Sequence, residues 1–90
     1  MNETKMLVGS LSNDLFRVAT LTNRGSIKAS RRFAMESKRW AIPLLKMNVP
    51  DYIKNIADDV AQSDNDIDLE KAEKYLMYGI LLQNYSLHLK

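Results

Sequence analysis

Apolar residues recur at three- and four-residue spacing along most of the chain, and no segment alternates apolar and polar residues as a half-buried strand would. The first such stretch covers residues 4–23 and stops before Gly25, which suits a left-handed helix cap. Its apolar stripe consists of Leu7, Leu11, Leu15, Val18 and Thr22. The pattern predicts an all-α protein whose first helix spans about residues 4–23.

A second helix is expected from residue 27 to at least residue 41, with Ser26 as its N-cap. Pro43 lacks an amide hydrogen and disfavours helical geometry at the residue before it, so we expect a kink or a break near Pro43. The apolar face of this helix is predicted to contain Ala29, Phe33, Ala34, Trp40, Ala41 and Leu44.

Two further helices are expected in the second half of the chain. Pro50 and Asp51 mark the start of a short third helix, which stops in the polar run 63–66. Asp66 or Asp68 is then placed to cap a fourth helix over about residues 68–88. We therefore expect residues 1–90 to form one domain, a small bundle of three to four helices joined by short loops.

The second half of the fourth helix is apolar nearly all round, and its apolar residues form two stripes. One stripe contains Tyr75, Tyr78, Leu82, Tyr85 and Leu89, and the other contains Leu69, Ala72, Leu76, Ile80 and Leu87. The interpretation that we favour is that both stripes pack within the bundle. The alternative is that the tyrosine stripe is a partner surface or a homodimer seam, because tyrosine is enriched at contact hot spots.

Charge is divided unevenly along the chain. Residues 24–46 carry seven of the thirteen basic residues and one acid, whereas eight of the eleven acids lie in residues 51–73. On a helical wheel the basic residues share an arc of about 120°, opposite the apolar face of the second helix. This cationic face contains Arg24, Lys28, Arg31, Arg32, Lys38 and Arg39, together with Lys46. It predicts contact with phosphates or with an acidic protein surface, unless solvent or the chain's own acids cover it.

Two more specific interpretations of these charged segments fit poorly. A helix-turn-helix motif centred on Gly25 would require Thr20, Arg24, Ser26 and Arg31 to pack in a core, so any nucleic-acid binding should be directed at the backbone. The alternating acids of residues 64–68 suggest a calcium loop, but Leu69 stands where that loop needs glycine. Helix capping explains these acids better.

No residues suggest catalysis. The chain has no cysteine, its one histidine, His88, lies near the C-terminal end of the sequence, and its three glycines are too scattered to hold a phosphate. We therefore expect no enzyme activity, no metal, no cofactor and no small-molecule substrate. The most apolar window, residues 75–82, is far shorter than the roughly 20 residues that cross a bilayer, and no export signal is evident. These features favour a cytoplasmic protein without membrane contact.

No resemblance to a known family is specific enough to transfer a function. Two hypotheses remain from the residues themselves. The first is a non-enzymatic protein-interaction bundle that meets itself or an acidic partner through the fourth helix or the cationic face. The alternative is a nucleic-acid-binding protein with weak sequence selectivity that uses the cationic face.

Overall fold

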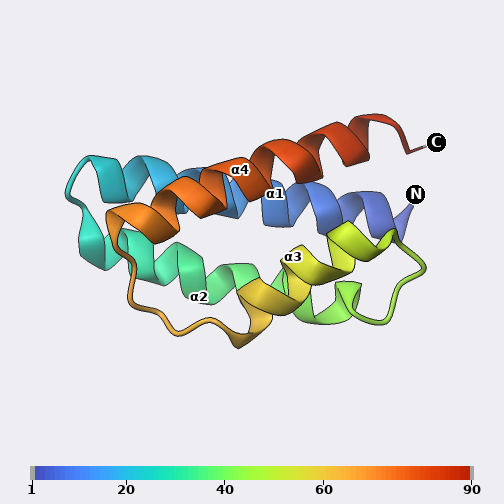
Figure 1. Cartoon of the computed structure of the whole chain (residues 1–90), viewed down its shortest axis with the longest axis horizontal. Coiled ribbons are helices and arrows are strands. Elements are labelled where there is room, and N and C mark those ends of the chain that lie inside the picture. Colours follow the sequence, from blue (N-terminus) through green and yellow to red (C-terminus); the bar gives the residue numbers. More distant parts are fainter. Residues whose placement is uncertain (1, 90) are drawn as a thin grey trace.

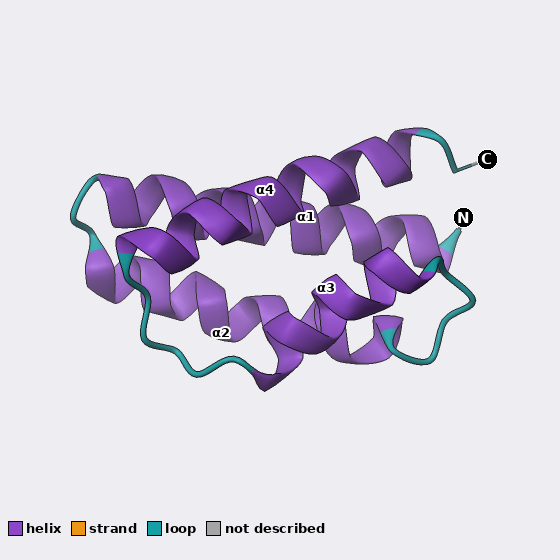
Figure 2. Cartoon of the chain, viewed as in Figure 1, coloured by secondary structure: helices purple, strands orange, loops and turns teal. Residues whose placement is uncertain are grey.

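Four helices and the loops between them account for residues 2–89, the part of the chain that the computed structural model describes (Figure 1, Figure 2). The helices are α1 (Glu3–Asn23), α2 (Ile27–Leu44), α3 (Asp51–Gln62) and α4 (Leu69–Leu87), and no strand occurs among these residues. The predicted all-α bundle is confirmed. The bounds predicted for α1 and α4 agree with the observed ones within one residue at each end.

The helices run up and down in chain order, so that each is roughly antiparallel to the one before it (Figure 1). Helix α1 packs along both α2 and α4, and α3 packs against α2. The four-helix bundle measures 37 × 22 × 20 Å along its principal axes. Because α1 has long neighbours on two sides, it is the helix around which the bundle is organised.

The helix ends follow the predicted signals with one difference. Gly25 adopts the left-handed conformation, with φ of 79°, and reverses the chain between α1 and α2. Asp68 caps α4, since its carboxylate accepts a hydrogen bond from the Lys71 backbone N–H at 2.8 Å. Ser26 occupies the predicted N-cap position of α2, but its side chain makes no capping hydrogen bond and therefore does not cap the helix.

Helix α2 ends at Leu44, one residue after Pro43, and the chain then turns through residues 45–47. The predicted kink or break near Pro43 thus takes the form of a helix end, because Pro43 offers no amide to continue the hydrogen-bond ladder. Lys46 consequently lies beyond the helix and does not extend its cationic face.

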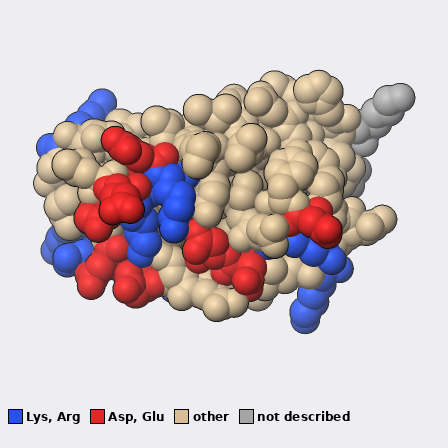
Figure 3. Space-filling view, viewed as in Figure 1, with Lys and Arg blue, Asp and Glu red and all other residues tan. Residues whose placement is uncertain are grey.

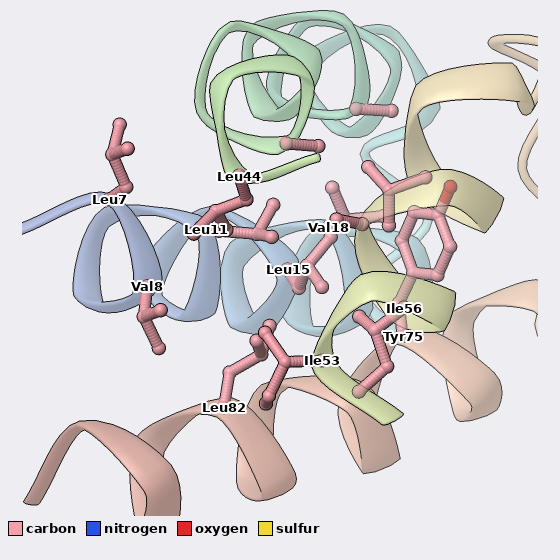
Figure 4. Close-up of a cluster of buried hydrophobic side chains, with 14 of the residues drawn as sticks. Leu7, Val8, Leu11, Leu15, Val18, Leu44, Ile53, Ile56, Tyr75 and Leu82 are labelled. Atoms are coloured by element: carbon pink, nitrogen blue, oxygen red, sulfur yellow. The ribbon is translucent and has the colours of Figure 1, made fainter. Parts of the chain in front are cut away.

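The core lies between α1 and its neighbours, and all four helices contribute to it (Figure 4). All five residues of the predicted α1 stripe are buried, as are Ala34, Ala41 and Leu44 on α2. Phe33 and Trp40, which we expected in the core, are only partly buried and pack against its edge. Their places on the buried side of α2 are taken by two small polar residues, Ser30 and Ser37.

Small residues let α1 approach α4 closely. A side chain at Gly79 would place its Cβ 3.0 Å from the Phe16 ring, and the Gly79 carbonyl accepts a hydrogen bond from Ser12 Oγ at 2.8 Å. Ala72 lies two turns earlier on the same side of α4 and is buried as well. This contact fixes which side of α4 faces inward, and therefore which side faces outward.

Candidate functional site

The tyrosine stripe of α4 faces the interior of the bundle. Tyr75 and Leu82 are buried in the core (Figure 4). Tyr78 and Tyr85 are partly buried and pack against it. The Tyr78 hydroxyl donates a hydrogen bond of 2.7 Å to Asp59 on α3. For this stripe the structure agrees with our favoured interpretation of internal packing, and it leaves no partner surface at Tyr75 and Leu82.

The contact between Tyr78 and Asp59 also ties α4 to α3 electrostatically. Lys74 lies 3.0 Å from the same Asp59 oxygen that accepts the Tyr78 hydroxyl. Burial tends to raise the pKa of Asp59, but the hydrogen bonds from Tyr78 and Lys74 outweigh it and lower that pKa. Burial and the Asp59 carboxylate raise the pKa of Tyr78, so the phenol stays a hydrogen-bond donor.

The second stripe of α4, which we expected to pack inside, is instead exposed except at Ala72. With its immediate neighbours it forms an apolar surface that we call the outer flank, whose members are 39 to 73% exposed. The outer flank consists of Leu76, Met77, Ile80, Leu81 and Leu87. These side chains share an arc of about 140° on the helix.

The outer flank is free of charge. No charged residue occurs between Lys74 and His88, and Figure 3 shows Lys, Arg, Asp and Glu gathered toward the start of α4 rather than over its later turns. Within residues 2–89, none of the helices combines the length and the apolar content that crossing a bilayer requires. An exposed apolar surface of this kind is typical of a protein contact.

The loop between α3 and α4 covers part of the cationic face of α2. Arg31 lies 3.6 Å from Asp66, and Lys38 donates a hydrogen bond to the Ser63 carbonyl. Lys38 is partly buried beneath this loop. Two of the six predicted contact cations therefore have partners within the molecule.

The same loop closes around a lysine from α4. Lys71 Nζ lies 3.0 Å from Asp64 Oδ1, 3.1 Å from the Asp64 carbonyl oxygen and 3.0 Å from the Asp66 carbonyl oxygen. The hydrogen bond from Lys71 lowers the pKa of Asp64, which is otherwise solvated. The oxygens of this acidic loop thus converge on an ammonium group supplied by the protein.

The other four predicted cations remain on the surface. Arg24, Lys28, Arg32 and Arg39 are exposed, and none of them forms an ion pair within the described part of the chain. The Arg39 guanidinium lies over the Trp40 ring, 5.2 Å from its centroid. The structure thus separates the cationic face into a paired edge, where Arg31 and Lys38 have partners in the loop, and an open edge beside α1.

A buried carboxyl lies below the open edge. Asp14 on α1 accepts a hydrogen bond of 2.9 Å from the Trp40 indole N–H. Burial raises the pKa of Asp14 to about 6, with a further rise from the nearby Glu36 side chain, while Trp40 and Arg17 act in the opposite direction. One ring nitrogen on α2 thus fixes the position of a carboxyl group on α1.

Sequence reasoning missed two parts of these surfaces. Arg17 on α1 reaches the open edge and lies over the Phe33 ring at 5.2 Å, which wheel analysis of α2 alone does not show. The outer flank was missed because large aliphatic residues were expected to mark the buried side. The small residues Ala72 and Gly79 mark it instead, and their seven-residue spacing is visible in the sequence.

Comparisons with known proteins add no further assignment. No family model matches the sequence, and no curated protein and no solved structure is significantly similar to it.

Proposed function

We propose that this protein is a non-enzymatic, self-associating interaction module, in which two copies meet through the outer flank of α4. The observation that carries the proposal is the exposure of five large apolar side chains on one uncharged surface. Leaving such a surface in water is unfavourable by roughly 25 cal/mol for each Å² of apolar area, so its burial by a partner favours association.

The polar residues at the two ends of the outer flank favour a second copy as that partner. An antiparallel pair of α4 helices, with the two-fold axis crossing between Ile80 and Leu81, places Glu73 of each copy opposite His88 of the other. The two helix dipoles also oppose each other in this arrangement. A two-fold interface uses the same residues on both copies, as a single uniform patch requires.

The test is the mass of the protein in solution, measured by sedimentation equilibrium across a concentration series. We expect the unmodified chain to dimerise and the Ile80→Glu variant to be monomeric, because the introduced carboxylates would face each other across the axis. Met35→Glu is the matched control, since Met35 is also an exposed apolar residue but lies on α2, away from the outer flank. It should leave the dimer intact.

Two results would contradict the proposal. One is a monomeric unmodified chain at every concentration reached, and the other is a dimer that Ile80→Glu leaves unchanged. Circular dichroism of each variant confirms that helix content is preserved, so a change in mass is not a consequence of unfolding.

A further inference from the structure

The α1–α2 turn leaves an open groove of about 970 Å³ between the last turns of α1 and the first half of α2. Phe33 and Ala29 line its apolar part, whereas Arg17, Lys28 and Arg32 supply positive charge. These residues come from both helices, so the groove exists only in the folded protein. It lies on the open edge of the cationic face, away from the loop that pairs with Arg31 and Lys38.

Arginine and aromatic side chains are paired twice along this seam. The Arg17 guanidinium lies over Phe33 and the Arg39 guanidinium lies over Trp40, each 5.2 Å from the ring centroid. A guanidinium placed over an aromatic ring has a second face to offer to another planar group, and nucleic-acid bases stack on guanidinium planes. The groove therefore combines stacking surfaces with cations.

From this combination we infer that the groove binds single-stranded nucleic acid, with a base stacked on the Arg17 guanidinium and phosphates held by Lys28 and Arg32. Lys28 and Arg32 are one turn apart, about 6 Å along the helix axis. On α2 the open cations from Lys28 to Arg39 extend over about 16 Å along the helix axis, which exceeds the length of one nucleotide, whereas Arg24 lies before this helix, at the C-cap of α1. A strand fits this row better than a free nucleotide does.

Glu36 is the one acid that lines the groove, and it opposes the binding of phosphate. Removal of the Glu36 charge should therefore raise the affinity for an oligonucleotide, whereas removal of a cation should lower it. Glu36→Gln should strengthen oligonucleotide binding severalfold. If the groove instead bound cationic or neutral peptides, the same variant should leave oligonucleotide binding unchanged and should bind those peptides no more tightly than the unmodified chain does.

The experiment is fluorescence anisotropy of a labelled single-stranded oligonucleotide, and of its duplex, at low and near-physiological salt. We expect the single strand to bind more tightly and the affinity to fall steeply as salt rises, because each phosphate contact releases counterions. Arg32→Gln and Arg17→Gln should each weaken binding about tenfold, in the range expected for loss of a phosphate or stacking contact.

The matched control is Arg31→Gln, which removes the same charge from the adjacent residue. Arg31 is exposed but lies outside the groove and is paired with Asp66, so this variant should change the affinity less than twofold. If Arg31→Gln and Arg32→Gln weakened oligonucleotide binding equally, the loss would reflect net charge alone, and the proposed site would be wrong. Absence of binding at low salt, tighter binding of the duplex, or full displacement by a mononucleotide at similar concentration would overturn it as well.

This inference is independent of the proposed self-association. The groove lies on α1 and α2, and the outer flank lies on α4. Oligonucleotide binding should therefore persist in the Ile80→Glu variant. Loss of binding in that variant, with helix content preserved, would show that the groove alone is not the binding site.

Discussion

Helices α2 and α4 both pack against α1, and each has small residues on its buried side. On α2 these are Ser30, Ala34, Ser37 and Ala41, and on α4 they are Ala72 and Gly79. The outward sides of the two helices differ, because α2 exposes cations whereas α4 exposes aliphatic side chains. The comparison teaches that the size of a residue, as much as its polarity, decides which side of a helix is buried when helices approach closely.

The largest expected change in stability comes from one of two adjacent leucines on α4. Leu82 is 0% exposed and Leu81 is 39% exposed, so the same substitution on α4 samples both sides of the helix. Leu82→Ala should lower the free energy of unfolding by about 3 kcal/mol, because it leaves a cavity. Leu81→Ala should lower it by less than about 1 kcal/mol, measured on the monomeric Ile80→Glu background by chemical denaturation. Similar losses would show that the assigned sides of α4 are wrong.

A second test concerns the closeness of the contact between α1 and α4. Gly79→Leu forces a side chain into the Phe16 ring and should lower the free energy of unfolding by about 2 kcal/mol. Gly9→Ala tests the glycine on the α1 side of this contact, where an added Cβ has Ser86 Oγ as its nearest atom, at 3.9 Å. It should raise stability by up to about 1 kcal/mol through helix propensity. Thermal melts of both variants decide whether small size is required at Gly79 alone.

The contact between α1 and α2 can be tested through pH. Because the folded state raises the pKa of Asp14 from 3.8 to about 6, its protonated form stabilises the fold below pH 3.8, and this contribution is lost as the pH rises through about 6. Asp14→Asn keeps an oxygen for the Trp40 N–H and removes the charge. It should raise the free energy of unfolding by about 1 to 2 kcal/mol at pH 8 and by almost nothing at pH 4. A gain that does not depend on pH would contradict this account.

The smallest expected effect lies on the outward side of α2. Arg31 and Asp66 form a pair at 3.6 Å whose side chains are both exposed, so Arg31→Ala should change the free energy of unfolding by only about 0.3 kcal/mol. Denaturation at low and high salt measures it, and the difference should shrink as salt screens the pair. A loss above about 1 kcal/mol would mean that the loop of residues 63–68 is fixed to α2 more firmly than its geometry indicates.

The fold was largely predictable from the sequence, since the α1 stripe, Gly25, Pro43 and Asp68 act through local geometry. The surfaces were less predictable, because they depend on which helix lies next to which. Leu76 and Ile80 have the same spacing as a buried stripe, and only the close approach at Gly79 turns them outward. Similarly, Arg31 and Arg32 are equivalent in the sequence, and the fold distinguishes them because Asp66 in the loop of residues 63–68 pairs with Arg31 alone.

The enclosure of Lys71 has a chemical consequence. Its ammonium is surrounded by three oxygens from the loop of residues 63–68, and its side chain is 18% exposed, whereas Lys28 is open to solvent. A nucleophilic amine must lose a proton and leave these oxygens before it reacts. Amine-directed acylating reagents should therefore modify Lys28 early and Lys71 late, and the labelling pattern becomes a residue-by-residue record of whether the loop is closed.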